Sequence, residues 1–386
     1  MQRKTLFACL TLLLSISLWG CQGQSPDYSA KKHSDKTVHE SAKEKGDVVS
    51  ETSSITLAAV GDILIHDRVY RDAKEANGYN FMPMLQQVQP YLAKPTVTTA
   101  NQETMIGGQE IGLSSYPSFN SPVAVGDALK ESGVDVVSLA NNHTLDRGET
   151  AVQNAIAHWD NIDMMYTGAY QSQKDSERIR VLETEANISL AFLSYTYGTN
   201  GIPTPSGKGY LVNRIDREKI ADDVEKAKQK ADVIVMQLHF GTQYERMPNN
   251  KQKELVQYVS DLGVDVVFGH HPHVLQPVDW VTGKDGNRTF VIYSLGNFLS
   301  GQDEFYRRIG GIAEVTIEKR ADNEIILKSP KFLVTFLDFT EETETNYQVV
   351  PMFQLTEEQL PQHQQHYQEM KQHVSQWMPK LEFIEK

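Results

Sequence analysis

The chain has 386 residues, 40% of them apolar, and a formal net charge of -13 at pH 7. Its length suits one large α/β domain with additional segments, and its apolar content is enough for a sizeable core. The negative charge argues against nucleic acid as a partner, because the phosphate backbone would be repelled.

Residues 1–20 have the pattern of a lipoprotein signal peptide. A basic start is followed by the apolar stretch TLFACLTLLLSISLW, which is too short for a transmembrane helix. The sequence LWGC at 18–21 resembles a bacterial lipobox, although Trp19 departs from the small residue usual there. We therefore expect cleavage before Cys21 and attachment of a diacylglycerol to it. The alternative is an ordinary signal peptide with a chance cysteine.

The cysteine count limits the chemistry of the mature chain. Removal of residues 1–20 takes away Cys9 and leaves Cys21 alone, so no internal disulfide can form. A metal site in the remaining chain must therefore use His, Asp, Glu or Asn side chains.

Residues 21–54 are rich in Ser, Lys, Asp and Glu and poor in apolar residues. Such a segment cannot bury enough surface to offset its ordering entropy, so we expect a disordered tether. With a lipid on Cys21, the tether would hold the folded body at the extracytoplasmic face of the cell membrane. We expect the main domain over 55–340 and a C-terminal extension with a helix over 341–386.

From residue 55 onward, β-branched apolar runs alternate with amphipathic segments. The predicted strands are 55–61, 134–140, 188–196, 232–238, 264–269 and 289–296, and the predicted helices are 122–132, 147–160, 216–230 and 250–262. Near the end, 311–319 and 324–337 are expected to form an antiparallel pair, followed by a terminal helix at 357–377. This alternation predicts a layered α/β body with a largely buried sheet.

Polar side chains cluster where the predicted strands end. They are Asp62, Glu103, Asn142, His143, His239, His270, His271, His273 and Asn297, with His66 four residues beyond the first. Each alone is typical of a helix cap, a turn or a hydrogen-bonded structural residue. Together they favour one crevice, because the carboxyl ends of strands in α/β folds converge. Neutral imidazoles, carboxylates and an amide oxygen are suitable ligands for a divalent cation.

The same stretches resemble the ordered motifs of the CapA family of poly-γ-glutamate (capsule) synthesis proteins. They are AVGDILIHD, NQE, SLANNHTLDRG, QLHFGTQYE, GHHPHVLQP and YSLGNF, spread from about 55 to about 298. The resemblance implies membership of the calcineurin-like metallophosphoesterase superfamily. It also implies a metallophosphoesterase-like sheet sandwich flanked by helices, with C-terminal strands and a terminal helix.

The resemblance further implies roles for individual residues and two divalent ions, Mn, Zn or Fe. The expected metal ligands are Asp62, Glu103, Asn142, His239, His271 and His273. Glu103 is a departure, because the superfamily commonly has an aspartate at that place. His143 is expected to protonate a leaving group. His66, His270 and Asn297 are candidates either for metal ligation or for orienting the ligands.

Three functions remain open at this point. The first is an accessory role beside an integral-membrane synthase, in which the site contributes to synthesis or export of an anionic capsule polymer. The second is metal-assisted hydrolysis of a cell-envelope substrate, with His143 as general acid. The third, a transport binding protein, predicts a two-lobed hinge, and we rank it last because the sequence shows no repeated βα half.

Overall fold

The computed structural model describes residues 52–386. The predicted signal peptide, the lipidation site Cys21 and nearly all of the predicted tether lie outside the described residues. The first strand of the folded body, β1, begins at Ser53. None of the helices in the described part of the chain is both long and apolar enough to span a bilayer.

Two large β-sheets form the centre of the body. The larger has nine strands: β1 (Ser53–Leu64), β4 (Val97–Gln102), β5 (Val136–Ser138), β6 (Met165–Thr167), β13 (Asn297–Ser300), β14 (Ile309–Lys319), β15 (Ile325–Thr340), β16 (Thr345–Pro351) and β17 (Glu382–Phe383). The smaller has six: β7 (Arg180–Glu183), β8 (Ser189–Thr196), β9 (Val233–His239), β10 (Val266–His270), β11 (Val278–Thr282) and β12 (Arg288–Ile292). A separate hairpin pairs β2 (Lys74–Glu75) with β3 (Gly78–Tyr79).

Helices flank the two sheets, and the last of them packs against the apolar layer between the sheets. They are α1 (Asp67–Asp72), α2 (Met82–Leu85), α3 (Gln89–Ala93), α4 (Ala124–Glu131), α5 (Gly148–Asn161), α6 (Gln173–Ser176), α7 (Arg217–Lys228), α8 (Asn250–Asp261) and α9 (His363–Ser375). The four long helices predicted from apolar periodicity correspond to α4, α5, α7 and α8. The predicted terminal helix is present as α9, although it begins later than expected.

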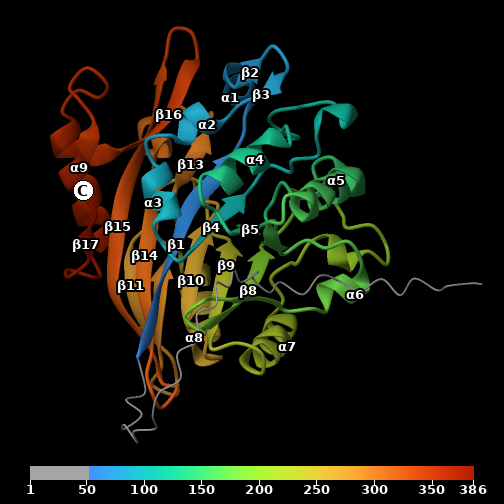
Figure 1. Cartoon of the computed structure of the whole chain (residues 1–386), viewed down its shortest axis with the longest axis vertical. Helices are drawn as coiled ribbons and strands as arrows, with labels where there is room; N and C mark the ends of the chain where they lie inside the picture. Colours follow the sequence, from blue (N-terminus) through green and yellow to red (C-terminus); the bar gives the residue numbers. More distant parts are fainter. Residues whose placement is uncertain (1–51) are drawn as a thin grey trace, which may run out of the picture. The chain divides into compact units, whose positions relative to one another are not determined.

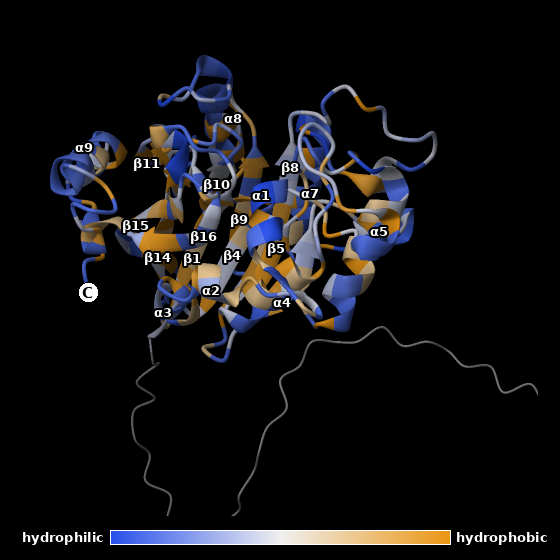
Figure 2. Ribbon diagram, turned by 90° about the horizontal axis from the view of Figure 1, so that it is seen from above, coloured by the Kyte–Doolittle hydropathy of each residue, from blue (hydrophilic) through white to orange (hydrophobic). Residues whose placement is uncertain are grey.

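Three buried apolar layers hold the elements together. One layer lies between the two sheets and includes Leu57 of β1, Val235 of β9 and Phe268 of β10. A second joins the larger sheet to α4 and α5, and a third joins the smaller sheet to α7 and α8. The predicted helix-flanked sheet sandwich is therefore confirmed (Figure 1). Figure 2 shows the same arrangement by hydropathy, with apolar strands inside and hydrophilic helix surfaces outside.

Parallel pairing determines where the polar strand ends lie. In the larger sheet β1, β4 and β5 are parallel neighbours, and in the smaller sheet β8, β9 and β10 are parallel neighbours. Each set therefore presents its carboxyl ends together. The predicted antiparallel pair near the C-terminus is also present as β14 and β15.

The prediction of one strand over 289–296 is wrong at its end, because the strand β12 stops at Ile292. The chain leaves the smaller sheet after Ile292 and enters the larger sheet at Asn297, where β13 pairs with β1. Gly296 makes the crossing possible with a φ of +66°, and a Cβ there would lie 2.5 Å from the Ile309 carbonyl oxygen. The crossing brings Asn297 opposite Asp62 in the β1–β13 register.

Candidate metal centre

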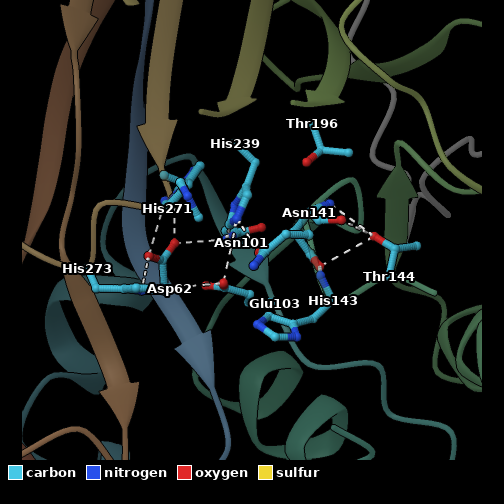
Figure 3. Close-up of polar contacts among 12 residues, drawn as sticks. Asp62, Asn101, Glu103, Asn141, His143, Thr144, Thr196, His239, His271 and His273 are labelled. Atoms are coloured by element: carbon cyan, nitrogen blue, oxygen red, sulfur yellow. Dashed lines mark hydrogen bonds and ion pairs between the residues drawn. The ribbon is translucent and has the colours of Figure 1, made fainter. Parts of the chain in front are cut away.

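The expected ligands meet where the two sheets present their strand ends (Figure 3). Asp62 lies in β1, Glu103 directly follows β4, and His239 is the last residue of β9. His271 and His273 follow β10. All five side chains belong to residues that are at most 4% exposed, so the centre is enclosed by the body of the protein.

The backbone after β10 has two residues with positive φ angles at the site. His271 has a φ of +97° and His273 a φ of +59°, a region that side chains other than glycine rarely adopt. Such local strain typically persists where surrounding structure fixes a functional geometry. Here it turns both imidazoles toward Asp62 and Glu103 (Figure 3).

Two groups of ligand-type side chains share one carboxylate. The first consists of Glu103, His239 and His271, and the second of Asp62, Glu103 and His273. Within each group the ligand atoms lie within 4.8 Å of one another. Glu103 Oε1 is 3.5 Å from His239 Nε2 and 3.7 Å from His273 Nε2. Glu103 is thus the carboxylate that the two groups have in common.

The buried carboxylate of Glu103 shows that the pocket fits a cation. Both of its carboxylate oxygens are buried and accept no hydrogen bond. Burial raises the pKa of Glu103 well above its usual value, and the nearby carboxylates of Asp62 and Asp146 raise it further. An unpaired buried carboxylate is expensive, and a divalent cation would supply the missing partner.

The protonation states of the other ligands agree with this fit. Burial lowers the pKa of His271 to about 3 and the pKa of His239 well below its usual value, so both imidazoles are neutral. Burial alone would raise the pKa of Asp62, but the imidazoles of His270 and His273 hold that pKa well below its usual range. Neutral imidazoles and an ionised carboxylate are the forms that bind metals.

Asn142 adds an amide oxygen to the first group. Its Nδ2 donates to Asn200 Oδ1 at 3.2 Å, which leaves Oδ1 facing His239 Nε2 at 2.7 Å. An amide oxygen and an imidazole nitrogen that converge at this distance can both ligate one ion. The structure therefore brings Asn142 next to His239 of the first group.

His143 lies outside both ligand groups and is held by its neighbours. Its backbone N–H donates to Asn141 Oδ1 at 2.9 Å, and its Nδ1 is 2.7 Å from Asp146 Oδ2. The edge of the ring packs against Phe119, with centroids 4.7 Å apart. The Asp146 carboxylate favours the tautomer with hydrogen on Nδ1, which leaves Nε2 free to exchange a proton.

Three residues were candidates either for metal ligation or for orienting the ligands, and all three lie outside the two ligand groups. They are His66, His270 and Asn297. His270 Nδ1 is 3.2 Å from Asp62 Oδ1, so this imidazole contacts a ligand. Asn297 Oδ1 is 3.1 Å from His273 Nδ1 and orients that ring. His66 Nδ1 lies 3.0 Å from both the Leu64 carbonyl oxygen and the Gly301 backbone nitrogen, which ties this ring to the backbone.

Three residues that contact the candidate ligands or His143 were not predicted from the sequence. Asn101 donates from Nδ2 to Asp62 Oδ1 at 2.8 Å, and its place two residues before Glu103 on a strand was a usable signal. Asp146 follows His143 by three residues, a spacing that allows contact in a turn. The ring of Tyr197 lies 4.6 Å from that of His271, and no pattern in the sequence indicated this contact.

Solved structures with a similar arrangement are distant. The NAD nucleotidase of Haemophilus influenzae aligns with a TM-score of 0.47 at 10% identity, covering 86% of this chain and 64% of that one. The calcineurin-like phosphoesterase YfkN of Bacillus subtilis aligns with a TM-score of 0.44 at 15% identity, covering 83% of this chain and 99% of that one.

The sequence comparisons are more specific. The PGA biosynthesis protein CapA of Bacillus subtilis is 29% identical over 222 residues, which are 56% of this chain and 53% of that protein. The capsule biosynthesis protein CapA of Bacillus anthracis is 30% identical over 261 residues, which are 65% of this chain and 61% of that protein. The chain thus spans between half and two thirds of the length of these relatives.

A family model described as bacterial capsule synthesis protein PGA_cap matches residues 56–302. This range covers well over half of the chain and includes every ligand of the two groups. The chain therefore belongs to the PGA_cap family of bacterial capsule synthesis proteins.

Proposed function

We propose that this protein contributes to the synthesis or export of poly-γ-glutamate, or of a related anionic capsule polymer, through a pair of divalent cations. The names of its relatives refer to capsule, PGA and polyglutamine synthesis. The observation that carries the proposal is Glu103, whose unpartnered carboxylate belongs to both ligand groups. Carboxylates of the polymer are hard oxygen ligands that divalent cations accept readily.

The donor set narrows the choice of ion. Three imidazoles, two carboxylates and one amide oxygen form a mixed nitrogen and oxygen site without thiolates. Such a set suits Mn, Zn or Fe better than Ca or Mg, which prefer oxygen alone. The cations held there would neutralise polymer charge and polarise a bound carbonyl or phosphoryl oxygen.

Binding of poly-γ-glutamate to the purified full chain tests the proposal. We expect calorimetric binding in the presence of Mn²⁺ and its loss on addition of a chelator. The variant E103Q should lose both metal and polymer, whereas E245Q, at an exposed loop position outside the ligand groups, should keep both. Polymer binding that is equally strong in chelator and in E103Q would contradict the proposal.

A second candidate function is hydrolysis of an ester in the cell envelope. The observation that favours it is the contact of 2.7 Å between His143 Nδ1 and Asp146 Oδ2, which is not needed for binding alone. With Nδ1 directed to the carboxylate, Nε2 can deliver a proton to a leaving oxygen. The variant H143A should abolish turnover of a chromogenic phosphodiester and leave metal content and polymer binding intact. Unchanged turnover would remove this role.

We also propose that a lipid on Cys21 tethers the protein to the outer face of the cytoplasmic membrane, beside an integral-membrane synthase. The support is the sequence of residues 1–21 alone. Mass spectrometry of the mature N-terminus should find an acylated cysteine. The variant C21S should move from the membrane to the soluble fraction, and membrane retention of C21S would contradict the anchor.

A further inference from the structure

A cavity of about 800 Å³ lies beside the candidate metal centre. Tyr197 belongs to its wall, and the ring of Tyr197 is 4.6 Å from that of His271. Phe240 and Gly241, which directly follow the ligand His239, line it as well. The cavity and the metal centre therefore lie next to each other, and Tyr197 contacts both.

The lining combines an apolar surface with positive charge. Ile215, Phe240 and Leu255 supply the apolar part. Arg217 and Lys251 are both exposed, and neither forms an ion pair with any described residue. The guanidinium of Arg217 lies over the ring of Tyr258 at 4.8 Å, which holds it in place. The basic side chains of Arg217 and Lys251 outnumber the single carboxylate of Glu254 in the lining, so the cavity has a local excess of positive charge although the protein as a whole is acidic.

Tyr197 connects this cavity to the metal centre. Its side chain is 49% exposed although its ring stacks parallel to that of His239 at 6.4 Å. The ring of Tyr244, which is 40% exposed and does not line the cavity, lies 6.2 Å from that of His273. Exposed aromatic rings next to buried ligand-type side chains are typical of a ligand-binding surface.

We propose that this cavity is a subsite for an anionic polyamide chain that extends away from the cations. The chain's carboxylates would pair with Arg217 and Lys251, and its methylene groups would pack on Ile215, Phe240 and Leu255. A chain of γ-linked glutamyl units carries both chemical features, whereas polyphosphate carries no apolar group for that surface. The inference rests on the proposed function, because the chain is the polymer that the metal centre would engage.

The test is calorimetric titration of the full chain, loaded with Mn²⁺, with a γ-linked glutamyl oligomer of defined length. Exposed charge pairs contribute up to about 1 kcal/mol each, so R217Q and K251Q should each weaken binding about threefold to fivefold. The double variant should lose about tenfold or more, and R217K should retain most of the affinity. All variants should keep their metal content and their melting temperature.

The matched control is K253Q, on the same helix as Lys251. Lys253 has the same charge but points to Trp377, with its Nζ 5.2 Å from the ring, and it does not line the cavity. Oligomer binding by the double variant within twofold of K253Q would overturn the subsite, while loss of binding in E103Q would still uphold the proposed function.

Two other outcomes separate the proposals. Failure of the unmodified, Mn²⁺-loaded chain to bind the oligomer would refute the polymer role itself, and the subsite with it. Binding of inorganic tripolyphosphate that depends on Arg217 and Lys251, when the oligomer binds independently of them, would overturn the polyamide assignment. Oligomer binding that depends on both cations, with weaker binding of tripolyphosphate, would support it.

Discussion

The variant Glu103→Gln should have opposite effects on stability with and without metal. In the metal-free protein, Glu103 buries two carboxylate oxygens without a hydrogen-bond partner, close to the carboxylate of Asp62. Because the pKa of Glu103 is raised well above its usual value, the native chain at pH 7 must bury this charge or take up a proton that the unfolded chain does not bind. Gln carries no charge and avoids this cost, so metal-free E103Q should be more stable than the metal-free native chain at pH 7, by about 1–3 kcal/mol.

Bound metal should reverse the order of stability of the two proteins. A ligand present at about one hundred times its dissociation constant stabilises the native state by roughly 2.7 kcal/mol, and E103Q should forfeit most of this gain. The assay is thermal unfolding of both proteins in chelator and in a Mn²⁺ series, followed by circular dichroism. If metal-free E103Q were the less stable protein, or if Mn²⁺ raised both melting temperatures equally, the assignment of Glu103 as the shared ligand would be refuted.

Three further predictions concern other parts of the molecule. Burial raises the pKa of Asp265 to about 7, so its native carboxyl holds a proton that the unfolded chain releases near pH 4, and the contribution of this residue to native stability should fall as pH rises from 4 to 7. Urea unfolding should show this loss as a difference in stability between the native protein and D265N that changes by about 4 kcal/mol over this range; parallel pH profiles of the two proteins would contradict it. If the protein hydrolyses an ester, D146N should lower kcat about a hundredfold and alter the pH–rate profile without releasing metal. The reason is that the amide of Asn no longer favours hydrogen on His143 Nδ1. An unchanged pH–rate profile would count against this positioning role of Asp146. Gly296→Ala should destabilise the protein by roughly 2 kcal/mol or more, because its Cβ would meet the Ile309 carbonyl at a positive φ; an unchanged urea midpoint would show that the crossing tolerates a side chain.

The layered fold was predictable because its strands are buried on both faces. Continuous apolar runs such as 188–196 and 232–238 became β8 and β9 with bounds displaced by about one residue. The crossing after Ile292 was not predictable, because it depends on contacts of Gly296 with segments far away in sequence. The three-residue strand β6 was missed because it does not lie in a longer β-branched apolar run, whereas the three residues of β5 do.

A five-residue sequence that occurs twice could have predicted how two of the strands begin. The sequence GVDVV occurs at 133–137 and at 263–267, where β5 and β10 begin. In each copy the Asp side chain accepts a hydrogen bond of 2.8 Å from the backbone of the neighbouring strand, Asp135 from Thr98 N–H and Asp265 from Ile234 N–H. Both copies fix the start of a parallel strand whose far end carries site residues.

The candidate ligands were predictable from topology, whereas their supporting contacts were not. Strand ends of parallel sheets converge, so the positions of Asp62 and His239 at such ends were informative. Whether His270 or His271 faces the centre depends on the unusual φ angle after β10, which the sequence does not reveal. The proximity of Asp146 to His143 and of Tyr197 to His271 likewise arises only in the folded chain.

Anomalous X-ray diffraction from crystals of the Mn²⁺-loaded protein would locate the metal ions themselves. We expect two peaks about 3.5–4 Å apart, with the carboxylate of Glu103 between them. One ion would lie against His239 and His271, and the other against Asp62 and His273. A lone peak away from Glu103, or an empty centre at saturating Mn²⁺, would rule out a metal centre that shares Glu103.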